Sequence, residues 1–246
     1  MATSKAENGM RKKRARSPED TTTTPTQNAL QKRPKTTVST PVVLEDKIFS
    51  GNFDIYSMRL PFLAKEYLSK ESSIPQFEQL YKTILTYQAK NDRTGQCFLA
   101  NANTNGRFRA PSLQDPMEGF PFDITINSIT IKDPLTFSSS ELANFLTPKT
   151  IKKERGVTAM MKLVDDHCGI ASASGSFKMT RAWMKAATGD EEPAELFEGH
   201  AAFKVNFSGL YKRKGHGSGT SCEFAFWAIR AKKDENGEEI GLGSRL

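Results

Sequence analysis

The residues best suited to chemistry lie near the C-terminal end of the chain, in a glycine-rich segment that carries several cations. Lys212, Arg213, Lys214 and His216 follow Tyr211 there, and glycine occupies every second position from 215 to 219. Lysine and arginine neutralise phosphates, aromatic rings stack on bases, and glycine lets a backbone approach a phosphate closely. The segment therefore indicates nucleic-acid binding.

Two other segments interleave cations with aromatic rings in the same way. Arg107 and Arg109 flank Phe108 within an asparagine- and glycine-rich stretch that predicts a loop. The second set comprises Lys178, Arg181, Trp183 and Lys185. We predict phosphate contacts for the basic side chains and stacking for Tyr211, Phe108 and Trp183. The alternatives are a solvated loop or a lysine that lies over the core, and for Trp183 a core position of the ring.

Patterns for catalysis or metal binding are missing from the sequence. It has no G-x-S-x-G nucleophile elbow, no phosphate-binding P-loop, and no C-x2-C or H-x3-H pair. Three cysteines, an odd and sparse set, indicate a reducing compartment rather than a disulfide framework. We therefore expect a protein without enzymatic activity, metal or cofactor.

Positive charge is concentrated in the first 41 residues. The formal net charge is +7, and residues 1–41 contribute nine basic and three acidic side chains to it. This segment is rich in Thr, Ser and Pro, and it has too few apolar residues to offset the entropy of ordering the chain. We predict a disordered basic arm over 1–41. No membrane-spanning helix is expected, because no apolar run reaches about 18 residues. No secretory leader is expected either, because the N-terminus lacks a short apolar segment.

Two basic clusters in this arm are typical of nuclear localisation signals. They comprise Arg11, Lys12, Lys13, Arg14 and Arg16, and then Lys32, Arg33 and Lys35. The pattern resembles a bipartite signal, and the first cluster is sufficient for a one-part signal. A nuclear import receptor is therefore the expected partner, and the nucleus the expected location. Direct contact with nucleic acid, or a merely solubilising tail, are the alternatives.

Alternating apolar residues predict the sheet that must position these side chains. Apolar residues alternate along segments 201–212 and 221–231, which predicts two strands. The second segment is apolar on both faces, which favours a central strand. A long hairpin loop over 213–220 is expected to join them. Segment 120–131 predicts a strand with a bulge near Asn127–Ser128. Small residues over 169–177 predict a flexible stretch, followed by a short helix or strand. Helices are expected over 59–67, 76–88 and 138–153.

Together these patterns predict a β-rich α+β domain over 42–233, with an antiparallel sheet and a few helices. Its architecture is expected to be OB-like, or sandwich- or jelly-roll-like. The arm 1–41 precedes the domain, and a flexible charged tail, 234–246, follows it.

Three functions remain open. The first is a nuclear, non-catalytic protein that binds single-stranded DNA or RNA on its sheet and loops. The second is a viral coat or nucleocapsid-like structural protein, whose arm binds the packaged nucleic acid while the domain self-associates. The third is a nuclear interaction protein whose tail acts only as an import signal. Binding that survives loss of the arm favours the first function.

Overall fold

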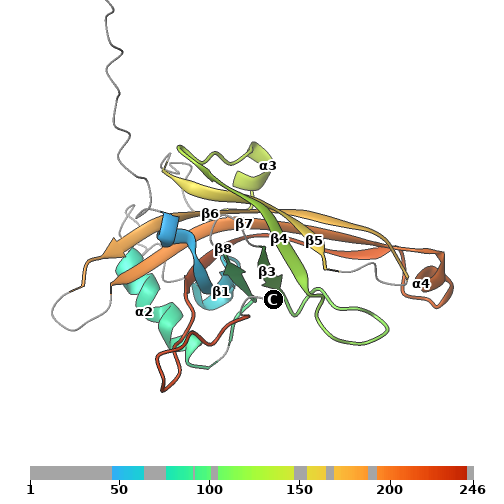
Figure 1. Ribbon diagram of the computed structural model, residues 1–246, viewed down its shortest axis with the longest axis horizontal. Coiled ribbons are helices and arrows are strands. Elements are labelled where there is room, and N and C mark those ends of the chain that lie inside the picture. Colours follow the sequence, from blue (N-terminus) through green and yellow to red (C-terminus); the bar gives the residue numbers. More distant parts are fainter. Residues whose placement is uncertain are drawn as a thin grey trace, which may run out of the picture. The chain divides into compact units, whose positions relative to one another are not determined.

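A computed structural model describes residues 46–63, 76–90, 92–100, 105–146, 154–164, 169–187 and 193–242. Within them, eight antiparallel strands form a closed barrel (Figure 1). The strands are β1 (Gly51–Ser57), β2 (Gly95–Leu99), β3 (Gly106–Arg109), β4 (Ile124–Lys132), β5 (Gly156–Leu163), β6 (Ile170–Lys185), β7 (Ala194–Phe207) and β8 (Gly219–Arg230). The helices are η1 (Asp46–Phe49), α2 (Phe77–Gln88), α3 (Ser139–Leu142) and α4 (Gly209–Arg213).

The strand order in the barrel is the order in the chain. Each strand pairs with its sequence neighbours, and β1 closes the barrel by pairing with β8, Phe53 opposite Arg230. The prediction of a β-rich antiparallel domain with a few helices is confirmed. OB folds and jelly rolls contain Greek-key connections, whereas this barrel is a simple meander, so neither architecture describes it.

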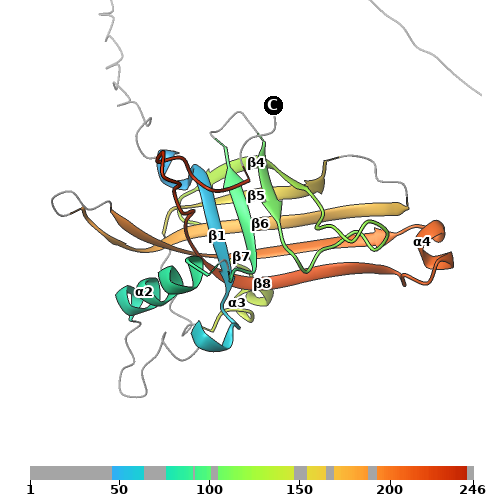
Figure 2. The same ribbon diagram turned by 90° about the horizontal axis from the view of Figure 1, so that it is seen from below.

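Unequal strand lengths give the barrel two different ends. Strand β6 has 16 residues, β7 has 14 and β8 has 12, whereas β2 has 5 and β3 has 4. The long strands therefore extend beyond the short ones (Figure 2). Helix α4 lies at one end, between β7 and β8, and α2 lies beside the other (Figures 1 and 2).

The inside of the barrel is a packed hydrophobic core. Large side chains enter it from strands around the whole barrel, among them Phe53, Phe108, Phe177, Phe203 and Phe226, all buried. Eight strands enclose a space that side chains just fill. Function must therefore be sought on the outside and at the ends of the barrel.

A second hydrophobic cluster covers part of the outer surface. Leu80 and Ile84 of α2 pack in one cluster with Ala225, Trp227 and Ile229 of β8. The alternate residues of β8, including Phe224 and Phe226, face the interior. This confirms the prediction that the strand is central in the sheet and apolar on both faces.

Several other predicted elements are confirmed. The register of β4 against β5 shifts between Asn127 and Thr130, and Ser128 has a φ of 52°, so the bulge is where the sequence predicts it. Helix α2 matches the segment 76–88 within one residue. Ser138 caps α3 in a capping box with Glu141, but the helix ends at Leu142 instead of continuing toward 153.

Three predictions of local structure are wrong. Residues 106–109 form strand β3 rather than a loop, because the barrel pairs Phe108 with Cys97 on β2 and Ile124 on β4. Residues 170–185 form one continuous strand, β6, rather than a flexible stretch and a short element. Tyr211 lies on α4 rather than on a strand, because β7 ends at Phe207.

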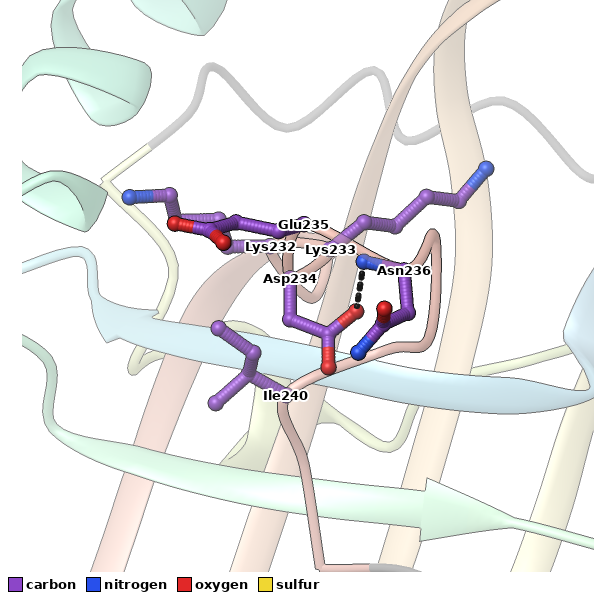
Figure 3. A pocket seen from close by; sticks show the side chains of 6 residues that line it. All are labelled: Lys232, Lys233, Asp234, Glu235, Asn236 and Ile240. Carbon is purple, nitrogen blue, oxygen red and sulfur yellow. Dashed lines mark hydrogen bonds between the residues drawn. The ribbon is translucent and has the colours of Figure 1, made fainter.

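The segment after β8 turns back and contacts β1. Residues 232–240 form a turn in which the Asp234 carboxylate accepts the Asn236 backbone N–H at 2.8 Å; Figure 3 shows this bond in the open depression lined by Lys232, Lys233, Glu235 and Ile240. Glu239 then accepts hydrogen bonds from the backbone and side chain of Asn52. The depression is thus the surface of a turn that its own hydrogen bonds hold together.

Residues 1–41 lie outside the described residues. The arm and its eight nuclear-localisation residues therefore stay predictions.

Candidate nucleic-acid interface

Arg107 forms contacts that hold the fold together, and Arg109 lies near the same acidic side chain but remains partly exposed. Arg107 donates from Nε and Nη2 to the two carboxylate oxygens of Asp123, at 3.2 and 2.7 Å, and from Nη1 to the carbonyl of Leu242. Arg109 lies 3.9 Å from the same carboxylate, with 43% of its side chain exposed. Arg107 therefore ties β3 to the C-terminal segment rather than offering charge to a ligand.

The cations of β6 are also paired. Lys178 donates to Glu141 at 2.8 Å and to the carbonyl of Thr136 at 3.0 Å, which holds the α3 segment against the barrel. Arg181 pairs with Glu195 at 3.0 Å. The more exposed Lys185 lies 3.4 Å from Glu78 on α2. The structure does not bring these residues together with the C-terminal cations.

Two of the three predicted stacking rings are buried. Phe108 is fully buried inside the barrel. Tyr211 is buried at the α4 end, against Phe207 and against the backbone of Gly169, where an added Cβ would lie 2.0 Å from the tyrosine ring. Trp183 is partly buried and packs against the outer cluster, with its ring centroid 5.7 Å from that of Tyr81. Phe108 and Tyr211 therefore belong to the core, whereas Trp183 keeps some exposed surface.

The cations around α4 are different. Lys212, Arg213 and Lys214 are exposed, and neither Lys212 nor Arg213 forms an ion pair with any residue that the structure describes. His216 lies just beyond them, with its ring edge-on to Tyr211 at 5.9 Å. Gly215 and Gly217 have positive φ and open space around them, so the backbone of this turn is accessible.

The loop between β3 and β4 lies beside α4 and is organised by Asp115. The Asp115 carboxylate accepts the backbone N–H groups of Met117, at 2.7 Å, and Glu118, at 3.3 Å. The backbone of Asp115 also bonds that of Phe120. The hydroxyl of Tyr211 donates to this carboxylate at 3.1 Å, so one buried acid joins the loop to α4.

The loop and helix together present apolar side chains that the sequence interpretation missed. Phe120 is 71% exposed, Met117 46% and Leu210 37%. The Nζ atom of Lys214 lies 3.9 Å from the Met117 sulfur, so cations and apolar groups adjoin. We call the set Met117, Phe120, Leu210 and Lys212–Lys214 the α4 tip. The sequence signal for this exposed surface was the presence of large apolar residues in a turn-rich segment that has neither strand nor helix periodicity.

A carboxyl group and an imidazole with perturbed pKa values lie elsewhere, on the outer face of β7. Burial, with a smaller contribution from Glu154, raises the pKa of Glu198 to about 7. Burial lowers the pKa of His200, which Lys178, Glu141, Glu223 and Asn144 surround. His200 is only 2% exposed, so a substrate would not reach it.

The described residues contain no group of three or more His, Cys, Asp or Glu that could hold a metal ion. In the same part of the chain, no helix is long and apolar enough to cross a membrane.

Comparison with known proteins adds no assignment. The chain matches no family model, no curated protein and no solved structure. Its function must therefore be argued from the site itself.

The bond between Tyr211 and Asp115 gives a first testable prediction. We expect Tyr211→Phe to lower the free energy of unfolding by about 2 kcal/mol, since a hydrogen bond to a buried charged group is lost while the ring is kept. Urea unfolding measures the change. Tyr87→Phe, on a partly exposed ring of α2, is the matched control. A loss no greater than the control's would show that the bond does not hold the loop.

Proposed function

We propose that this protein binds nucleic acid without catalysing a reaction on it, through the basic arm and the α4 tip. The observation that carries the proposal is the cluster Lys212–Lys214, which is exposed and lacks ion-pair partners among the described residues. Cations that are not already neutralised can replace the counterions of a phosphate backbone, and the release of those counterions drives binding.

The pairing of other cations supports this location. Because Arg107, Lys178, Arg181 and Lys185 lie beside carboxylates, their charges are largely compensated within the fold. The cluster on α4 therefore stands out against a nearly neutral background. A local positive patch of this kind steers phosphates toward one end of the barrel.

We further propose that the two arm clusters direct the protein to the nucleus through an import receptor. Arg11–Arg16 and Lys32–Lys35 supply the dense positive charge that such receptors read. The same clusters add phosphate contacts once nucleic acid is bound. The arm increases affinity, and the α4 tip gives the folded domain its own contact.

The test is the salt dependence of binding by full-length variants. We expect the triple substitution Lys212→Ala, Arg213→Ala and Lys214→Ala to weaken oligonucleotide binding at least about tenfold at low salt. The slope of log K against log salt concentration should also fall, by up to about 2, since each single-strand phosphate contact contributes about 0.7. Fluorescence anisotropy over a salt series measures both quantities.

A matched control removes the same charge from the other end of the barrel. Lys47, Lys132 and Lys232 are exposed, and they lie on η1, at the end of β4 and just after β8. Their replacement by alanine should leave the slope nearly unchanged. Equal effects of the two triple variants would contradict a site at α4.

Neutralising Arg11–Arg16 in the same full chain separates the remaining functions. If this change alone abolishes binding and light scattering shows large assemblies, a coat or nucleocapsid-like structural role replaces the proposal. If the wild-type chain binds no oligonucleotide at moderate salt, the arm serves as an import signal only. Binding that survives loss of the arm cluster and is lost with the α4 cluster supports the proposal.

A further inference from the structure

Phe120 is the most exposed large apolar side chain among the described residues. It is 71% exposed, and Met117 in the same loop is 46% exposed. An aromatic ring left in water forgoes the free energy of burial, and a group of exposed apolar side chains favours a surface that another molecule covers. This surface lies beside α4, where the β3–β4 loop adjoins the helix.

Hydrogen bonds hold the backbone of this loop in place before any partner arrives. Asp115 accepts the backbone N–H groups of Met117 and Glu118, and its own N–H donates to the carbonyl of Phe120. Pro121 pairs with Gln114 at the base of the loop. Because this backbone is already ordered, a ligand that covers Phe120 need not order the loop.

The chemistry beside the ring selects the ligand. Lys214 touches Met117, and Lys212 and Arg213 extend the positive charge along α4. Phe120 shares its loop with Met117, which Lys214 contacts, and the α4 cations have no ion-pair partner among the described residues. This combination matches a nucleotide, which has a flat base and an anionic phosphate. In a duplex the base faces are covered by neighbouring pairs, whereas in a single strand they are open to an aromatic side chain.

We propose that Phe120 is a base-stacking residue, and that the α4 tip therefore prefers unpaired nucleotides to duplex. This inference rests on the proposed nucleic-acid binding and adds the class of nucleic acid. Lys212, Arg213 and Lys214 contact phosphates of either form, and Phe120 with Met117 contacts only an exposed base. The two contributions differ in their response to salt, because stacking releases no counterions.

The experiment compares full-length wild type with Phe120→Ala, Phe120→Leu and Phe120→Trp. Fluorescence anisotropy is recorded with a single-stranded oligonucleotide and with its duplex, at several salt concentrations. Phe120→Ala should weaken single-strand binding about 5- to 100-fold, the range for loss of one stacked base, and change duplex binding less than about twofold. The salt slope should not change. Phe120→Trp should retain binding, and Phe120→Leu should not.

Controls separate stacking from other uses of the surface. Ile240→Ala removes another half-exposed apolar side chain, on the turn after β8, and should leave binding unchanged. If Phe120→Ala changes neither form while the Lys212–Lys214 triple variant weakens both, the stacking inference is overturned and the proposed function stands. If the triple variant changes neither form, the proposed site at α4 fails as well.

A lipid surface is the competing occupant. Wild type, Phe120→Leu and Phe120→Ala are therefore also tested in flotation with vesicles of phosphatidylcholine and phosphatidylserine. Vesicle binding that Phe120→Leu retains and Phe120→Ala loses, with single-strand binding unaffected by either, would overturn the inference in favour of membrane contact.

Discussion

Replacing Asp54 with alanine is expected to lower the free energy of unfolding by about 3–5 kcal/mol. The Asp54 side chain is 1% exposed and lies on the outer face of β1, under α2. Its carboxylate accepts hydrogen bonds from Gln88 Nε2 at 2.9 Å, from Arg93 Nη1 at 3.0 Å and from Gln96 Nε2 at 3.0 Å. Alanine removes this acceptor from the guanidinium of Arg93 and the amide of Gln96, and leaves Gln88 Nε2 with only its bond to the carbonyl of Arg230. Urea unfolding followed by tryptophan fluorescence measures the loss.

Two further variants test the reason for that loss. Asp54→Asn keeps the shape and an acceptor oxygen but removes the charge, so its effect should be intermediate. Asp92→Ala removes a neighbouring carboxylate that is exposed, and should change stability by less than about 0.5 kcal/mol. If Asp54→Ala lowered the free energy of unfolding as little as Asp92→Ala does, the hydrogen bonds to Asp54 would not be what holds α2 on the barrel.

Glu198→Gln is expected to stabilise the protein at alkaline pH. Burial raises the pKa of Glu198 from 4.5 to about 7. The carboxyl group therefore ionises at a higher pH in the native state than in the unfolded chain. Wild-type stability therefore falls as pH rises between about 4.5 and 7, and the penalty is constant above that window. Glutamine cannot ionise. The free energy of unfolding of Glu198→Gln should exceed that of wild type by about 3 kcal/mol at pH 8 and by less than about 1 kcal/mol at pH 5.

The measurement compares the two proteins at the same pH, by urea unfolding from pH 5 to 8. His200 acts in the opposite direction, because burial lowers its pKa and stability is lost as falling pH protonates it. Its contribution is common to both proteins and cancels. Glu238→Gln, on the exposed turn after β8, is the control and should show no pH-dependent gain. A gain for Glu198→Gln that does not grow with pH would contradict a buried, neutral carboxyl.

Elements whose pattern is local were predictable from the sequence. Strand β8 has apolar residues at both alternations, and the barrel does bury both its faces, Phe226 inside and Trp227 under α2. The bulge in β4 was visible because its apolar residues change phase near Asn127 and Ser128. In both cases the residues that form the element also carry its signal.

Elements that depend on distant partners were not predictable in this way. Segment 170–177 consists mostly of small residues, which predict flexibility. In the barrel a Cβ at Gly175 would lie 2.7 Å from the ring of Phe203, so small residues there make room for the core of the neighbouring strand. Phe108 was misassigned for a related reason. On a strand, alternation turns Phe108 away from the arginines on either side and into the barrel.

The distribution of charge follows from the amino-acid sequence alone: a strongly basic arm, a nearly neutral domain and a cationic segment at Lys212–Lys214. Which cations are paired with carboxylates depends on the fold. Arg107 pairs with Asp123, Lys178 with Glu141 and Lys185 with Glu78, across separations that no local pattern spans. The fold also decides which ring is exposed, because it buries Tyr211 on Asp115 and leaves Phe120 in solvent. Composition determines total charge, whereas folding determines which charges and rings are neutralised or buried by their neighbours.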